Sequence, residues 1–127
     1  MTYSEIKKDI LTVPDDYWLA YTLSADFQLK NGLAARFNNK YLQENWLMNN
    51  YGKEYLEEYK NYFPGDCLSD PEYKIFNLVV KERHHQKATL YAVRRAMRKM
   101  KEYCNVVLET SRLETGRLRP FRPWVHP

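Results

Sequence analysis

Residues 18–37 read WLAYTLSADFQLKNGLAARF, and this stretch decides the fold. It opens with a nearly continuous apolar and β-prone run, Trp18 to Leu23, of the length expected for a strand buried on both faces. A polar segment, residues 24–31, follows. Gly32 then begins a pattern with apolar residues at spacings of three and four, namely Leu33, Ala34, Phe37 and Tyr41. The stretch therefore predicts a strand, a loop and a helix.

A strand, a loop, a glycine and a helix in this order also form an arrangement that binds phosphate. A loop beyond the carboxyl end of a strand can aim backbone N–H groups at an anion, and the first turn of the helix adds its own. A single glycine also serves a tight turn that binds nothing. From this stretch alone both interpretations stay open, and the steric one is the commoner.

The composition is that of a small single-domain protein. A chain of 127 residues is long enough to bury one core. No run approaches the roughly 18 apolar residues of a membrane span, and the start MTYSEIKKDI lacks the apolar centre of a signal peptide. We therefore expect no membrane association and a cytoplasmic location. Cys67 and Cys104 stand apart, which favours two small buried residues over a zinc site or a disulfide.

The charge is distributed unevenly along the chain. Residues 1–80 hold 8 Lys and Arg against 12 Asp and Glu, whereas residues 81–127 hold 12 against 4. The second half therefore carries a net charge of +8, and the first half −4. A basic half attracts polyanions in general, which admits nucleic acid, a dinucleotide or an acidic protein as a partner.

Shorter elements are expected on both sides of the deciding stretch. Residues 3–11 are predicted to form an edge strand or its lead-in, and the turn around Pro14 separates it from the next strand. Residues 42–62 carry apolar side chains at helical spacing, which predicts one or two helices that cover a sheet. A short strand is expected near Cys67, before a turn at residues 69–72.

The clearest strand is KIFNLVV, residues 74–80, which is too apolar for an edge. Lys81 follows it directly, at the point where open α/β sheets bind their ligands. The segment KERHHQK, residues 81–87, is equally compatible with a solvated loop. His84 and His85 have no acidic or thiol partner at ligand spacing, so we expect no metal there.

A long helix is predicted next, with Thr89 as its N-cap and its end near Cys104. Its predicted buried stripe consists of Leu90, Val93, Met97, Met100 and Cys104. Its basic face consists of Arg94, Arg95, Arg98, Lys99 and Lys101, and is either solvated or a surface for polyanions. Residues 106–108 suggest another strand. Residues 109–127 form an Arg- and Pro-rich tail, which we expect to be extended or poorly ordered, beyond a domain of residues 1–108.

Strands that alternate with helices on both sides of a sheet predict a three-layer α/β/α domain. The chain also resembles the macro domains, in particular the branch of O-acetyl-ADP-ribose deacetylases and ADP-ribosyl-glutamate hydrolases. Three segments carry the resemblance: IKKDILTVPDDYWLAYTLSADF (6–27), GLAARFNNKY (32–41) and IFNLVVKERHHQKATLYAVRRAMRKMKEYC (75–104). They span most of residues 6–104 in the order and spacing of that family. The resemblance implies a mixed central sheet and ADP-ribose or an ADP-ribosylated derivative as the ligand, with no cofactor.

The resemblance also implies roles for particular residues. Asp9, with the backbone of Ile10, would receive the adenine amino group, a task that suits a carboxylate because it only accepts. Lys81 corresponds to the lysine that attacks the anomeric carbon of the distal ribose, and a lysine amine is a nucleophile when burial lowers its pKa. The other implied ligand-binding positions are Ser24 and Asp26 at the distal ribose, Gly32 and Leu33 in the glycine loop, and Arg112 and Gly116 in a second phosphate loop.

The chain departs from the family in two places. Lys30 and Asn31 stand where relatives read Gly-Ala before the glycine that corresponds to Gly32. In TSRLETGRL, residues 110–118, Glu114 replaces a glycine and no aspartate follows, so the expected catalytic carboxylate is missing. We therefore predict a C-terminus that is truncated or altered, and an enzyme that is weak or inactive as a hydrolase or deacetylase but still binds its ligand.

A second hypothesis comes from charge alone. The basic helix and the Arg-rich tail, with Phe121 and Trp124 available for stacking, fit a non-catalytic module that binds nucleic acid or an acidic protein. Such binding would weaken steeply with salt and would ignore free ADP-ribose.

Overall fold

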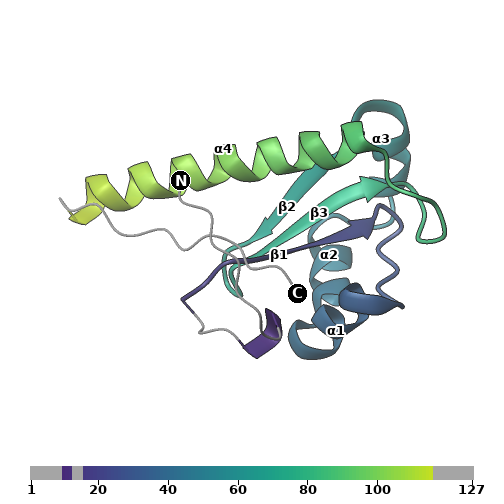
Figure 1. Ribbon diagram of the computed structural model, residues 1–127, viewed down its shortest axis with the longest axis horizontal. Coiled ribbons are helices and arrows are strands. Elements are labelled where there is room, and N and C mark those ends of the chain that lie inside the picture. The colour runs from purple at the N-terminus through teal and green to yellow at the C-terminus, as the bar shows by residue number, and fades with distance from the viewer. Residues whose placement is uncertain (1–9, 13–15, 116–127) are drawn as a thin grey trace.

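The computed structural model places three strands between two layers of helices (Figure 1). It describes residues 10–12 and 16–115. The strands are β1 (Leu19–Ser24), β2 (Asp66–Asp70) and β3 (Ile75–Lys81). The helices are η1 (Ile10–Thr12), α1 (Gly32–Tyr41), α2 (Gln43–Asn50), α3 (Tyr55–Tyr62) and α4 (Leu90–Thr115). The strand, loop and helix predicted for residues 18–37 are confirmed.

The sheet is mixed, with strand order β1-β3-β2. β1 pairs parallel to β3, and β2 pairs antiparallel to β3. Residues 75–80 of β3 are all buried, because this strand has a partner on each side and helices on both faces. The prediction that KIFNLVV is an interior strand is confirmed.

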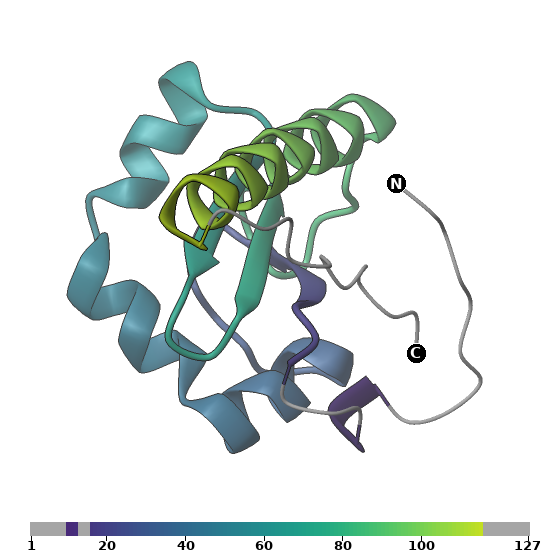
Figure 2. The same cartoon turned by 90° about the vertical axis from the view of Figure 1, so that its left-hand side faces the viewer.

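One face of the sheet is covered by α1, α2 and α3, which lie together on the side opposite α4 (Figure 2). Aromatic side chains supply much of this core. Tyr21 of β1 stacks on Phe37 of α1 with ring centroids 4.4 Å apart, and Phe27 stacks on Tyr55 of α3 at 5.1 Å. Large buried rings of this kind explain why a helix as short as α3 is stable against the sheet.

Among the described elements only α4 covers the other face, and its buried stripe differs in part from the predicted one. Ala92, Ala96, Met100 and Cys104 pack on the sheet, whereas Leu90 is 64% exposed and Met97 37% exposed. Alanine has the smallest apolar side chain, so the first two turns of α4 lie closer to the sheet than leucine and methionine side chains facing it would allow. The predicted stripe is confirmed at Val93, which is half-buried against the same cluster, and at Met100 and Cys104, whereas it is wrong at Leu90 and Met97.

Three predictions at the ends of the chain are also wrong where the structure describes the residues concerned. Residues 106–108 belong to α4 and form no strand, because a helix that has already formed extends at little cost through Val and Leu. α4 continues to Thr115, so residues 109–115 of the predicted tail are helical. Ile10 lies in the 3₁₀ helix η1 rather than in a strand. Residues 1–9 and 116–127 lie outside the described part of the chain.

A chain of buried polar side chains crosses the α1–α3 side of the core. The Tyr21 hydroxyl donates to Asn77, whose amide donates to Gln43 Oε1 at 3.0 Å. Gln43 Nε2 in turn donates to Asp70 Oδ2 at 2.9 Å. Gln43, Asp70 and Asn77 are fully buried. Because each polar group is satisfied, the network links β1, β3, α2 and β2 in one register.

Buried tyrosines predict a loss of stability at alkaline pH. Burial raises the pKa of Tyr55 far above its usual range, and the nearby Asp66 carboxylate raises it further. The folded pKa exceeds the unfolded value near 10, so this contribution is complete below about pH 10 and is lost as pH rises above it. We expect denaturant titrations above pH 10 to show a fall of about 1.4 kcal/mol per pH unit for each such tyrosine. In a Tyr55→Phe variant the dependence of unfolding free energy on pH should be less steep by about 1.4 kcal/mol per pH unit. An unchanged slope would contradict a raised pKa of Tyr55.

Both cysteines are free thiols. Cys104 is buried, as predicted, whereas Cys67 in β2 is only half-buried. Burial raises the pKa of Cys67 to about 12 and that of Cys104 to about 11. Both thiols are therefore protonated and poorly reactive at neutral pH.

Candidate functional site

The carboxyl ends of β1 and β3 meet at one edge of the sheet, where their pairing is irregular. The register shifts between Leu23 and Ser24, so that Ser24 lies opposite Lys81. The Ala25 N–H donates to the Lys81 carbonyl at 2.8 Å, and the Asp26 N–H donates to the Glu82 carbonyl at 3.1 Å. The two chains therefore stay paired beyond the strands, and the bulge sets the positions of the side chains at this edge.

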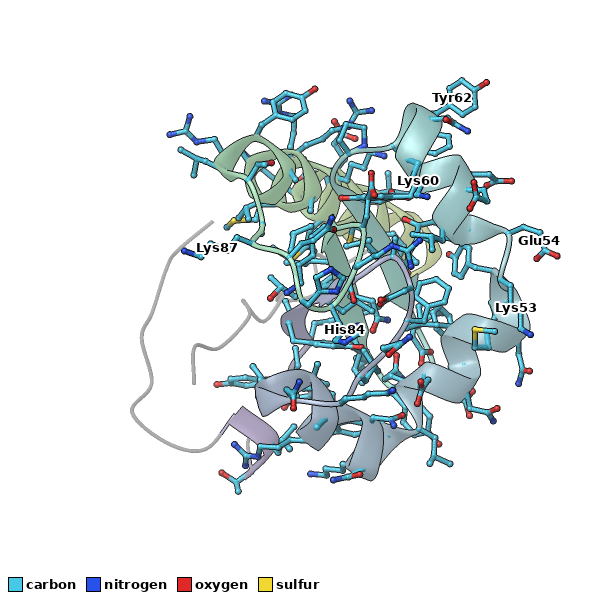
Figure 3. All side chains as sticks on the ribbon, turned by 90° about the vertical axis from the view of Figure 1, so that its right-hand side faces the viewer. Lys53, Glu54, Lys60, Tyr62, His84 and Lys87 are labelled. Atoms are coloured by element: carbon cyan, nitrogen blue, oxygen red, sulfur yellow. The ribbon has the colours of Figure 1, made fainter. Side chains whose placement is uncertain are left out.

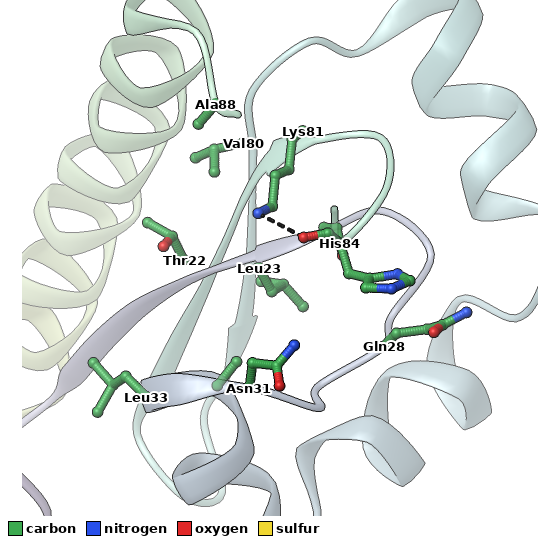
Figure 4. Close-up of a pocket in the computed structure, with 11 residues that line it drawn as sticks. Thr22, Leu23, Gln28, Asn31, Leu33, Val80, Lys81, His84 and Ala88 are labelled. Atoms are coloured by element: carbon green, nitrogen blue, oxygen red, sulfur yellow. Dashed lines mark hydrogen bonds between the residues drawn. The ribbon is translucent and has the colours of Figure 1, made fainter. Parts of the chain in front are cut away.

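A pocket of about 270 Å³ opens at this edge, between the strand ends and the start of α1 (Figure 4). We call it the strand-end pocket. Lys81 reaches into it from the end of β3, and Asn31 reaches in from the loop before α1. Its lining consists of Thr22, Leu23, Ser24, Gln28, Asn31, Leu33, Ala34, Val80, Lys81, His84 and Ala88.

Lys81 is half-buried, and its ammonium group is held at the mouth of the pocket. The Nζ donates a hydrogen bond to the backbone carbonyl of His84 at 3.1 Å (Figure 4). This contact closes the loop that follows β3 back onto the strand end. The amine therefore has a defined position next to the pocket and a single neutral oxygen as its partner in the described part of the chain.

Asp26 fixes the same loop from the other side. Its Oδ2 accepts the His84 backbone N–H at 3.1 Å and lies 3.1 Å from His84 Nδ1. Its Oδ1 accepts the Ser24 hydroxyl at 2.5 Å and the Gln28 N–H at 3.2 Å. Burial alone would raise the pKa of Asp26, but the hydrogen bonds from Ser24, His84 and Gln28 together hold it below its usual range. Asp26 is therefore ionised at neutral pH and clamps the loop.

Removal of this clamp should loosen the loop. An Asp26→Ala variant is expected to lose about 2 kcal/mol of unfolding free energy at neutral pH, because several hydrogen bonds to a charged group disappear. The pKa of Asp26 is lowered on folding, so the difference from wild type should shrink as pH falls below about 4. Hydrogen exchange should accelerate at residues 82–88. Glu58→Ala, at an exposed position on α3, is the matched control, and equal losses in both variants would contradict the clamp.

Helix α1 begins at the pocket with the glycine of the deciding stretch. Gly32 has φ of +59°, a conformation that other residues rarely adopt, and Asn31 before it is extended. Leu33 and Ala34 of the first turn line the pocket, whereas Gly32 is exposed. The unpaired backbone N–H groups of a helix start favour an anion. The first turn of α1 therefore gives the pocket a partial positive charge.

The structure brings together some of the predicted site residues and not others. Ser24, Leu33 and Lys81 line the strand-end pocket, and Asp26 contacts its loop. Arg112 lies in α4, 22 residues after Leu90, roughly 33 Å along the helix axis. Residues 110–115, where a phosphate loop was predicted, are therefore helical instead, and a ligand-binding role of Arg112 stays a prediction. Asp9 and Gly116 lie outside the described residues, and of Ile10 only the backbone is described.

His84, Gln28 and Asn31 line the pocket, although none of them was predicted as a ligand-binding residue. His84 was considered only as a metal ligand, and its actual partner, Asp26, lies 58 residues away. One signal was present, since His84 follows the strand-end Lys81 by three residues, within reach of the same crevice. Among residues 10–12 and 16–115, no group of three or more His, Cys, Asp or Glu is arranged to hold a metal ion.

The basic face of α4 is largely solvated. Arg94, Arg98 and Lys101 are exposed, whereas Lys99 is half-buried and its Nζ lies 3.0 Å from Asp66 Oδ1. Lys99 therefore ties α4 to β2 and is not available to a polyanion. The hypothesis of nucleic-acid binding through this face stays a prediction. No helix in the described residues is long and apolar enough to cross a membrane.

The arrangement of strands and helices defines a fold class. A mixed sheet with parallel β1 and β3, layers of helices on both faces and a pocket at the strand ends form a macrodomain-like α/β fold. The macrodomain of Thermus aquaticus DarG has this fold, with a TM-score of 0.65 to the present chain. The match covers 97% of this chain and 96% of that chain at 13% sequence identity, so it shows the fold alone. No family model and no curated protein sequence matches the chain.

The comparison confirms the predicted fold class, including the mixed sheet within three layers. The comparison does not test the more detailed predictions about family branch and domain boundaries. The branch within the macro domains, the truncated C-terminus and the division at residue 108 stay predictions.

Proposed function

We propose that the chain is an ADP-ribose-binding domain and that the strand-end pocket receives the distal ribose with the phosphate next to it. The observation that carries the proposal is the meeting of Ser24, Lys81 and the first turn of α1 around one pocket. These positions come from three segments of the chain that resemble the macro domains. The macrodomain-like fold supports the same conclusion.

The chemistry of the lining suits a sugar phosphate. The first turn of α1 offers backbone N–H groups to a phosphate, and the Lys81 ammonium adds a full positive charge. Asn31 and Gln28 offer amides to ribose hydroxyls, and Leu33 and Val80 supply apolar contact. A volume of about 270 Å³ is at the lower limit for ligand pockets, so it takes part of ADP-ribose rather than all of it.

The proposed chemistry is removal of an acyl or glutamyl group from the distal ribose. For an ester at the anomeric carbon, the Lys81 ammonium first loses a proton to water, and the neutral amine attacks that carbon. The bond from the carbon to the ester oxygen breaks, the carboxylate leaves with the electron pair, and the new C–N nitrogen releases its extra proton to water. The product is ADP-ribose bonded to the Lys81 nitrogen. The carboxylate that would help water to release this adduct is missing from the sequence, so we propose slow turnover and an adduct that accumulates.

Binding is tested by calorimetry with ADP-ribose. We expect measurable heat and a raised melting temperature, because a ligand that binds only the folded state stabilises it. Leu33→Glu should abolish binding by adding a negative charge to the pocket, whereas Asn39→Glu, an exposed position on the same helix, should not. Absence of heat with wild-type protein at millimolar ADP-ribose would overturn the proposal.

A further inference from the structure

A second, larger pocket lies beside the strand-end pocket. Its volume is about 680 Å³, and it opens between the loop after β1, helix α2, the turn before α3 and the loop after β3. Gln28 lines both pockets, so the two adjoin. Asp26 lines the larger pocket while its carboxylate holds His84, which lines the smaller one. The two pockets therefore share Gln28 and are separated elsewhere by the contact between Asp26 and His84.

Three cations surround this larger pocket, which we call the basic pocket. They are Lys30, Lys53 and Arg83, each from a different segment of the chain. All three are exposed, and none has an ion pair or a side-chain hydrogen bond to another described residue. Figure 3 shows Lys53 in the turn before α3, where its side chain extends toward solvent at the edge of the view.

The two carboxylates in the same lining are already engaged. Asp26 accepts hydrogen bonds from His84, Ser24 and Gln28. Glu44 accepts a hydrogen bond from the Asn38 amide at 3.3 Å, while its own N–H donates to Asn38 Oδ1 at 3.0 Å. These hydrogen bonds orient the two carboxylates but leave their charge in place, so the lining holds three cations against two anions. The cations are exposed and the carboxylate oxygens are engaged, and the side chains free to bind a ligand are therefore the positive ones.

Met48 and Leu56 add half-buried apolar surface to the basic pocket. A ligand that fits must combine carboxylates with an apolar body and must be long enough to reach cations on three segments. A free phosphate uses only the charge. A peptide that carries several acidic side chains meets all of these conditions, since its backbone and side-chain carbons contact the floor while its carboxylates reach the rim.

We propose that the basic pocket binds the acidic polypeptide segment that carries the ADP-ribosyl group. The inference rests on the proposed function, because the modified side chain would enter the strand-end pocket past Gln28 while its neighbours lie across the basic pocket. It adds a substrate class, namely acidic segments of proteins rather than the free nucleotide. Recognition of the carrier then depends on Lys30, Lys53 and Arg83.

The test uses two probes and two matched variants. The probes are free ADP-ribose and an unmodified short peptide in which glutamate alternates with glycine. The variants are Lys53→Glu, in the basic pocket, and Lys60→Glu, an exposed position on α3 that lines neither pocket. We expect Lys53→Glu to weaken binding of the peptide about fivefold at low salt and to leave the affinity for ADP-ribose nearly unchanged. Lys60→Glu should change neither affinity appreciably.

The outcomes separate this inference from the proposed function. If wild-type protein binds ADP-ribose but not the peptide, or if both variants weaken the peptide equally, the inference is overturned and the proposed function stands. If Lys53→Glu weakens ADP-ribose as strongly as the peptide, the basic pocket holds part of the nucleotide and the inference is again overturned. If ADP-ribose does not bind while the peptide still distinguishes the variants, the proposed function fails and the basic pocket remains a peptide site.

Discussion

A Lys81→Ala variant is expected to form no covalent adduct with an ADP-ribosylated glutamyl peptide and to release the peptide at least about 100-fold more slowly than wild type. The reason is positional. Lys81 brings an amine to the pocket at the end of β3, and the described part of the lining contains no other amine or thiol. Intact-protein mass spectrometry after a single turnover should show one ADP-ribosyl group on wild-type protein and none on the variant.

The control for this experiment is Lys87→Ala. Lys87 is exposed in the same loop and lines neither pocket, so its substitution removes an equal charge without changing the site. The Lys81 side chain makes one hydrogen bond, to the His84 carbonyl, so its loss should cost only about 1 kcal/mol of stability and the variant stays folded. Equal adduct formation by Lys81→Ala and wild type would remove Lys81 from the mechanism.

A Gly65→Ala variant is expected to lose about 3 kcal/mol of unfolding free energy or more, the largest effect of a single methyl group that the structure predicts. Gly65 has φ of +91°, and a Cβ at this position would lie 2.3 Å from the backbone carbonyl oxygen of Ala92. The obstacle is helix backbone, which cannot rotate away as a side chain could. The methyl group must therefore push the first turns of α4 off the sheet.

Gly32→Ala is the matched control, because Gly32 also has a positive φ, of +59°, but nothing lies within 4 Å of an added Cβ. It should cost only the conformational penalty of about 1–2 kcal/mol. The difference between the two variants in urea denaturation therefore measures the close approach of Gly65 to α4. Equal losses would show that conformation alone, and not packing, sets the cost at Gly65.

The elements near the deciding stretch were predictable because their signals are local. The apolar run before Ser24, the polar loop and the glycine at the start of α1 each follow from residue types within a few positions. The interior position of β3 followed from its composition in the same way. The prediction failed at residues 106–108, where β-prone residues belong to a helix that began 16 residues earlier.

The stripe of α4 failed for a different reason. Leu90 and Met97 fit a helical period as well as Ala92 and Ala96 do, and hydrophobicity favours the larger side chains. The choice between the two sets depends on how closely α4 approaches the sheet. Gly65 and the alanines permit that close contact together, and they come from different segments.

By itself, the sequence determined where a strand, loop and helix, an interior strand and a strand-end lysine lie along the chain, because these depend on neighbouring residues. Only the tertiary structure decided what meets at the site. The bulge that sets Ser24 opposite Lys81 and the clamp between Asp26 and His84 join residues more than fifty positions apart. The basic pocket gathers its cations from three segments in the same way. Such contacts depend on strand pairing and helix packing, which no local pattern records.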